Sequence, residues 1–362
     1  MRSVRSFGVL FGFFASFLLV ACSARHAPVT PEAVTPCALV PVGGSGFVDG
    51  RARFREIFRE VLAARGEKSA SGEPCDDSAV LWKLAGEPAP TGRPALSGTS
   101  RGAYRVVVVP GLLAECVAEK TRAFDDARER LENLGYKMDY IQTRGRRASA
   151  VNADFIHDAA MSMPPGGKLL FVTHSKGAPD TLEALAKHPD LVERTAAVVA
   201  VSGAVNGSPL AEAFPDFLYK LANEMPLSTC PPGNGMEAVE CLRRSVRLSW
   251  LSAHPLPKSV RCYSLPAFAL RENMSFALLP FYDILAGADP VNDGMVLCSD
   301  AIIPGSVLLG YPNADHMAVA MPLDKANAPV LKGLYNKNAY PRAALLEAVV
   351  RFVEEDLERG GR

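Results

Sequence analysis

The chain has 362 residues, of which 48% are hydrophobic and 22% are charged. This length allows one large domain with insertions, or two small ones. Lys and Arg together number 39, and Asp and Glu also number 39, so the formal charges cancel. A balanced charge gives no general attraction for a polyanion, and we therefore expect no nucleic-acid partner.

Residues 1–21 have the pattern of an export signal. Two arginines precede an apolar run, residues 7–20, that is too short to be a permanent membrane-spanning helix. The run ends in the letters L-V-A-C, with Cys22 last, and this string resembles the lipobox of bacterial lipoproteins. The resemblance implies cleavage before Cys22, lipidation of its thiol and anchoring in the bacterial cell envelope, with Ser23 favouring the outer membrane. The alternative is an ordinary secretory signal in which Cys22 has no role.

Residues 22–46 are rich in Pro, Ala, Val and Thr and have no helical or strand period. This composition predicts a flexible tether. Residues 47–362 are then expected to form one domain.

Export would place the seven cysteines after Cys22 in an oxidising compartment, where most should pair and at least one is left free or joined to another chain. None of them shows the C-x-x-C spacing of a zinc site, so we predict no metal at the cysteines. The connectivity does not follow from the sequence, and the candidate pairs are Cys37 with Cys75, Cys230 with Cys241, and Cys262 with Cys298.

The domain begins with a predicted helix over 47–65, where apolar residues recur at spacings of three and four. A loop rich in Pro, Gly and Ser follows at 88–102. Strands and helices then alternate, which predicts a parallel sheet with right-handed crossovers. The expected strands are 105–109, 136–141, 168–172 and 195–201, and the expected helices are 118–134, 148–161 and 178–187.

The alternation stops at 208–258, which we interpret as an inserted cap or lid with helices at 210–224 and 236–250. Two short strands at 259–264 and 307–311 and a final amphipathic helix at 342–357 complete the predicted elements.

The apolar strand at 168–172 runs directly into the letters T-H-S-K-G, with Ser175 at the tip of the turn before a helix. This resembles the nucleophile elbow of the α/β-hydrolase superfamily, G-x-S-x-G, in which the residues two before and two after the serine must be small. Gly177 meets this demand, and Thr173 departs from it. The alternative is that Ser175 only caps the helix.

A serine nucleophile needs a base and an orienting carboxylate, which follow in this superfamily in the order acid, then histidine. The letters N-D-G-M-V at 292–296 resemble the segment around the triad acid of secreted bacterial triacylglycerol lipases, and Asp293 is the matching residue. His316 follows the last predicted strand, where the family has its histidine. Asp289 and Asp300 remain alternatives for the acid.

The oxyanion hole of the family consists of two backbone amides. The resemblance assigns one to Lys176, whose side chain is expected to be solvated. The other falls on Leu112, because the letters V-P-G-L-L at 109–113 resemble the H-G-hydrophobic segment of lipases.

The resemblance covers roughly 106–317 and includes the letters G-S-P-L-A at 207–211 and Cys298, which resembles a half-cystine of those lipases. It implies an α/β-hydrolase fold with a helical cap and a serine hydrolase that cleaves small-molecule or lipid esters. The lipases have a calcium-binding Asp soon after the histidine, whereas M-A-V follows His316 here, so no calcium, other metal or cofactor is predicted. The alternatives are an acyltransferase with the same triad, or a catalytically silent scaffold that binds a partner or lipid.

Overall fold

The structure is a computed structural model that describes residues 46–67, 77–94, 103–112, 114–117, 121–213 and 236–360. The predicted signal peptide, Cys22 and almost all of the tether lie outside these residues. No helix in the described ranges is both long and apolar enough to cross a membrane.

The described part of the chain contains a seven-stranded sheet in the order β1-β8-β7-β6-β5-β3-β4, in which every neighbouring pair is parallel. A two-stranded antiparallel sheet, β2-β9, accompanies it. The strands are β1 Val48–Asp49, β2 Leu81–Trp82, β3 Tyr104–Val109, β4 Lys137–Tyr140, β5 Lys168–His174, β6 Thr195–Val201, β7 Arg261–Leu265, β8 Val307–Leu308 and β9 Tyr311–Pro312.

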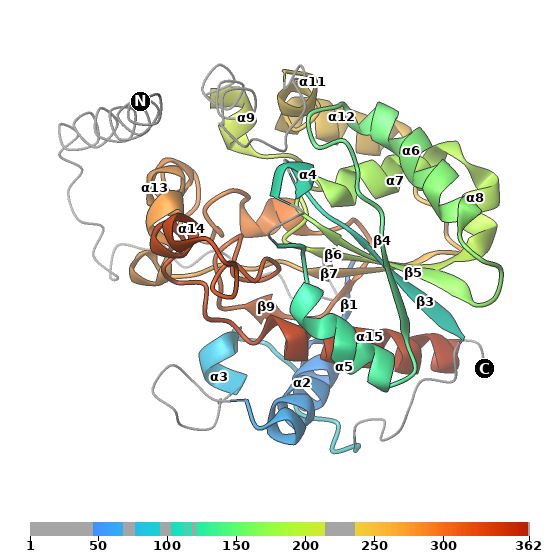
Figure 1. Cartoon of the computed structure of the whole chain (residues 1–362), viewed down its shortest axis with the longest axis horizontal. Helices are drawn as coiled ribbons and strands as arrows, with labels where there is room; N and C mark the ends of the chain where they lie inside the picture. The colour runs from blue at the N-terminus through green and yellow to red at the C-terminus, as the bar shows by residue number, and fades with distance from the viewer. Residues whose placement is uncertain are drawn as a thin grey trace, which may run out of the picture. The chain divides into compact units, whose positions relative to one another are not determined.

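Helices cover both faces of the sheet, as Figure 1 shows for α6, α7 and α8 on one side and α2, α5 and α15 on the other. The described helices are α2 Arg51–Arg65, α3 Asp77–Val80, α4 Ala114–Val117, α5 Arg128–Asn133, α6 Ser149–Ser162, α7 Gly177–Lys187, α8 Pro189–Arg194, α9 Pro209–Ala213, α11 Met236–Glu240, α12 Arg244–Ala253, α13 Leu279–Ala286, α14 Pro329–Leu334 and α15 Arg342–Gly360.

The strand sequences explain this layering. Because successive side chains of a strand point to opposite faces, the Val run of β3 supplies both sides of the sheet. Val106 and Val108 enter one hydrophobic cluster with α2 and α15, whereas Val107 and Val109 enter a second cluster with α6 and α7. The fold is the parallel, helix-flanked sheet that the sequence predicts.

The N-terminal segment of the domain belongs to the large sheet. Val48 of β1 pairs with Val307 of β8, and α2 then packs on α15. A Cβ at Gly50, between β1 and α2, would lie 2.8 Å from the side chain of Val307. The helix predicted from residue 47 therefore starts at Arg51, because the residues before it form the edge of the sheet.

Three other predicted elements differ from the structure. The helix predicted at 236–250 is divided into α11 and α12 by a turn at 241–243. In the helix predicted at 118–134, the described residues 121–134 are helical only from Asp125, because Phe124 has a left-handed φ of 57° that no right-handed helix contains. The strand predicted at 307–311 is divided between β8 on the large sheet and β9 on the small one.

The described part of the predicted cap consists of α9, α11 and α12, and residues 214–235 lie outside the description. The helix α12 is fixed to α7 by Arg247, which is 1% exposed and pairs with Glu183 at 2.5 Å. Arg147 binds Glu237 of α11 at 2.8 Å.

Cys262 and Cys298 are free thiols, so the predicted pairing between them is wrong. Cys241 is also a free thiol, and Cys230, its predicted partner, lies outside the described residues. The Cys241 thiol donates to Ala238 O. Cys262 lies near the start of β7, whereas Cys298 lies in a short 3-10 helix at the opposite end of the sheet. The pair Cys37–Cys75 lies outside the described residues.

Candidate active site

Ser175 lies between the last residue of β5 and the first residue of α7, in a sharp turn. Its φ is 55°, a conformation that non-glycine residues rarely adopt and that costs about 1–3 kcal/mol. A Cβ at Gly177 would lie 2.2 Å from Val109 O, so only glycine fits at that position of the turn. The strained turn and this close approach to β3 hold the Ser175 hydroxyl at the end of the sheet.

Thr173, the departure from the family motif, is accommodated by a hydrogen bond. Its side chain is fully buried between strands, and its hydroxyl donates to Val199 O of β6 at 3.0 Å. A buried hydroxyl without such a partner would destabilise the fold. The neighbouring strand β6 therefore supplies the hydrogen-bond acceptor that the buried Thr173 hydroxyl requires.

The structure brings Ser175, His316 and Asp293 together. The Ser175 hydroxyl lies 2.9 Å from His316 Nε2, and His316 Nδ1 lies 2.7 Å from Asp293 Oδ2. The carboxylate accepts a hydrogen bond from Nδ1–H, so Nε2 carries no proton and can take the proton of the serine. His316 and Asp293 are 2% and 1% exposed, so their hydrogen bond is shielded from water.

Asp293 is held by the backbone of its own loop. Its Oδ1 accepts the amides of Met295 at 2.9 Å and Val296 at 2.7 Å, and the amide of His316 donates to Asp293 O at 2.8 Å. The other candidate acids have different partners. Asp289 accepts the amide of Val291, and Asp300 pairs with Arg244 at 2.9 Å.

The segment after β3 passes directly beside the serine. A Cβ at Gly111 would lie 2.5 Å from Ser175 Cβ, so the backbone that leads to Leu112 contacts the nucleophile. In the described part of the chain, no backbone carbonyl accepts the amide of Leu112 or that of Lys176. Both predicted oxyanion donors therefore lie on segments next to Ser175, and neither N–H is bound by a backbone carbonyl of the described residues.

No model of a known protein family matches the chain, and neither does any protein of curated function. Among solved structures, the mature lipase BlEst2 of Bacillus licheniformis is 20% identical, with a TM-score of 0.45, over 62% of this chain and 89% of that one. A metagenomic carboxyl esterase, MGS0156, is 54% identical, with a TM-score of 0.81, over 90% of this chain and 98% of that one. The chain belongs to the carboxyl esterases of the α/β-hydrolase fold.

In this esterase the Lys176 side chain is buried, which corrects the expectation that it is solvated. Its ammonium is 0% exposed and lies 2.6 Å from Asp180 Oδ1, one turn along α7. The other oxygen of Asp180 accepts Asn152 Nδ2 of α6 at 2.7 Å. The sequence contains the i, i+4 spacing of this pair, but the spacing alone does not show which face of the helix is buried.

His174 packs against the imidazole of His316, with 4.7 Å between the ring centroids. Complete burial, and secondarily the neighbouring His316, lower the pKa of His174 to about 3. The ring is therefore neutral, and its Nε2–H donates to His316 O at 2.8 Å. This histidine lies beside the Ser–His pair, and its contact positions the His316 backbone.

Asp315, which directly precedes His316, was not predicted as a site residue. Its Oδ1 accepts the amides of Met317 and Ala318 at 3.0 and 2.8 Å, and its Oδ2 accepts the amide of Ser275 at 3.0 Å. These bonds fix the turn that carries His316. The sequence does contain a signal for this role, because Asp is common at the first position of a turn.

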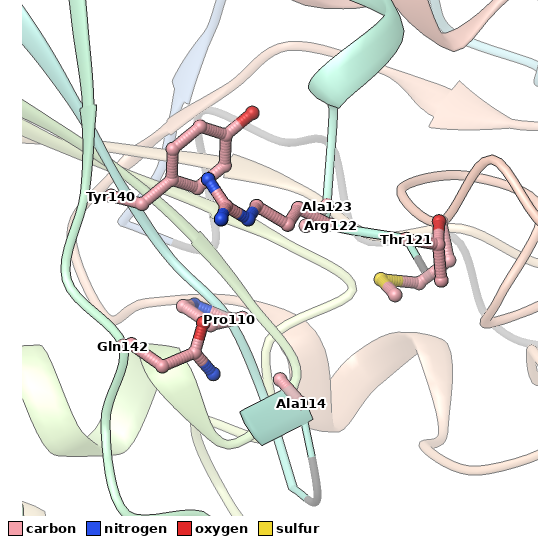
Figure 2. Close-up of a pocket in the computed structure, with 8 residues that line it drawn as sticks. Pro110, Ala114, Thr121, Arg122, Ala123, Tyr140 and Gln142 are labelled. Atoms are coloured by element: carbon pink, nitrogen blue, oxygen red, sulfur yellow. The ribbon is translucent and has the colours of Figure 1, made fainter. Parts of the chain in front are cut away.

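A small cavity lies next to the oxyanion segment, between the ends of β3 and β4 (Figure 2). Its volume of about 10 Å³ suits one water molecule. The guanidinium of Arg122 lies over the ring of Tyr140 at 5.6 Å on one wall (Figure 2). The lining residues are Pro110, Ala114, Thr121, Arg122, Ala123, Tyr140, Gln142 and Met321.

Proposed function

We propose that this esterase hydrolyses carboxylic esters through an acyl-enzyme on Ser175. His316 Nε2 takes the proton of the Ser175 hydroxyl as the oxygen attacks the ester carbonyl. Asp293 holds the His316 tautomer and stabilises the imidazolium that forms. The amides of Leu112 and Lys176 donate to the oxygen that becomes negative in the tetrahedral intermediate.

His316 then donates its proton to the departing alkoxide, and the alcohol leaves. A water molecule, deprotonated by the same Nε2, attacks the acyl carbon and releases the carboxylic acid with Ser175 restored. Each step uses one proton that moves between oxygen and His316 Nε2.

The hydrogen-bonded series Ser175–His316–Asp293 is the observation that carries this proposal. Replacing Ser175 by Ala removes the nucleophile and should lower kcat for a p-nitrophenyl ester by roughly 10³-fold or more. Ser249→Ala, at an exposed position of α12, is the matched control and should keep full turnover. Full turnover by a folded Ser175→Ala chain would end the proposal.

Lipid esters, or a polyester, are the substrates we propose, because the lipase-like segments surround the triad. Comparing kcat/KM for p-nitrophenyl esters of short and long acyl chains tests this, and a preference for the shortest chain would contradict it.

Acyl transfer to an alcohol would use the same acyl-enzyme. Product analysis with and without an added alcohol separates the two reactions, because only a transferase forms the new ester in preference to the free acid.

We also propose that residues 1–21 direct export, that Cys22 is lipidated, and that 22–46 tether the esterase to the cell envelope. The lipobox-like string at Cys22 supports this. Metabolic labelling with palmitate should mark the full chain and leave a Cys22→Ser variant unmarked. Equal labelling of both chains would contradict lipidation at this residue.

A further inference from the structure

Two histidines and an aspartate come together at the far end of α7, away from Ser175. His157 lies in the middle of α6, His188 follows the last residue of α7, and Asp190 lies in the first turn of α8. The length of α7 alone separates this cluster from the nucleophile by roughly 16 Å, at 1.5 Å per residue. The triad uses none of these residues.

The geometry points to a transition-metal site at His157, His188 and Asp190, and we propose that it binds Zn²⁺. One ligand atom from each residue lies within 4.8 Å of the other two. Ligand atoms around a tetrahedral Zn²⁺ are about 3.3 Å apart, given bond lengths near 2.0–2.1 Å. Side-chain rotations that move each atom by about 1 Å would close the site around the ion.

The two imidazoles already lie side by side. Their ring centroids are 4.1 Å apart and their planes differ by 17°. The side chains of His157 and His188 are only 20% and 19% exposed, whereas that of Asp190 is 55% exposed. Packing thus keeps both nitrogen donors close to each other, and one ring must turn out of the stack so that both lone pairs reach one ion. The carboxylate faces the solvent from which an ion would come.

Carboxylates next to the rings suit a metal-binding role. His157 Nε2 lies 2.9 Å from Asp190 Oδ2, and its Nδ1 lies 2.9 Å from Asp158 Oδ1. If Nε2 and Asp190 bind the ion, Asp158 accepts the remaining N–H, as carboxylates behind metal-bound histidines commonly do. Asp154 binds His188 Nε2 at 2.9 Å and can act in the same way.

The donor set selects the class of ion. Two imidazole nitrogens and one carboxylate oxygen suit Zn²⁺ and related transition metals, with water as the fourth ligand. Ca²⁺ and Mg²⁺ prefer oxygen ligands throughout, so we expect neither to bind here. An ion at this point would join α6 to the segment between α7 and α8, and would stabilise the folded chain.

Isothermal titration of the tag-free, metal-stripped chain with ZnCl₂ at about pH 8 tests the proposal, since protons compete for imidazole at lower pH. We expect one saturable ion per chain and a higher melting temperature with Zn²⁺. His157→Gln with His188→Gln should abolish both effects. Asp190→Asn, at an exposed position, should weaken binding at least roughly tenfold without affecting the fold.

His254→Gln is the matched control, because this exposed histidine just after α12 belongs to no cluster of three candidate ligands among the described residues. It should bind Zn²⁺ as the parent chain does, and all variants should keep the parent esterase turnover. Absence of a saturable site in the parent chain would overturn the proposal. Zn²⁺ stabilisation of the double histidine variant as large as that of the parent chain would also overturn it.

Discussion

At the scale of single residues, the site depends on the close approach of two backbones. The segment that carries the Leu112 amide can lie against Ser175 only because residue 111 has no Cβ. The nearest atom to such a Cβ would be Ser175 Cβ, at 2.5 Å, followed by Ser175 Oγ at 3.0 Å. An added methyl group must therefore displace either the nucleophile or the oxyanion segment.

Gly111→Ala should lower kcat by about 10²–10³-fold, which is the cost of losing one oxyanion donor. Steady-state kinetics with a p-nitrophenyl ester measures this change. Gly333→Ala is the control, since nothing lies within 4 Å of a Cβ at that position of α14. Unchanged kcat in a folded Gly111→Ala chain would show that the segment does not contact the reacting group.

His174 makes the stability of the fold depend on pH. Its pKa of about 3 in the folded chain lies below the ordinary value of 6.5. Between these values the unfolded chain binds a proton that the folded chain does not, so the free energy of unfolding decreases as the pH falls. The contribution is fully present above 6.5, and one proton gives a slope of up to about 1.4 kcal/mol per pH unit.

His174→Gln keeps an N–H donor for His316 O and removes the titrating group. Urea unfolding from about pH 7 to about pH 4 should therefore show a shallower loss of stability in the variant than in the parent chain. Other titrating groups are shared by both chains and cancel in the comparison. Equal slopes would mean that His174 is protonated in the folded state.

At the scale of elements, α7 connects the nucleophile to the rest of the helical face. The pair Lys176–Asp180 joins it to α6 through Asn152, and Glu183 joins it to α12 through Arg247. All of these groups except Glu183 are almost fully buried. Removal of one partner from a buried ion pair leaves an uncompensated charge, which destabilises the fold. The helix that follows Ser175 is thus fixed on two sides.

Lys176→Met should destabilise the chain by about 3–5 kcal/mol, as measured by urea unfolding. Lys187→Met, on the same helix in an exposed pair with Asp154, should cost about 1 kcal/mol or less. Adding Asp180→Asn to Lys176→Met removes the unpaired charge and should recover part of the loss. If Lys176→Met and Lys187→Met had equal effects, the buried pair would contribute nothing to stability.

At the scale of the whole molecule, the sequence predicted those features that depend on a regular apolar pattern or on the fixed order of residues in the α/β-hydrolase fold. The Val-rich strands 105–109 and 195–201 predicted the parallel sheet, because only a sheet covered on both faces needs apolar residues at every position. Ser175 and His316 could be found because each follows a predicted strand, and Asp293 because the letters around it resemble the acid segment of the family. The structure brings these three side chains within hydrogen-bonding distance.

The features that the sequence did not predict depend on contacts between distant segments. Two residues of β1 carry no periodic signal, and they join the sheet only because β8 offers a free edge. The burial of Lys176 depends on Asn152 of another helix. The stacking of His157 on His188 follows from the packing of α6 on α7, which neither helix sequence shows alone.

Reaction of the native chain with a fluorophosphonate, followed by peptide mapping, identifies the nucleophile, because only an activated serine reacts with such a reagent. We expect a single adduct on Ser175, and none in a His316→Ala variant. An adduct on another residue, or labelling of Ser175 that persists unchanged without His316, would contradict this expectation.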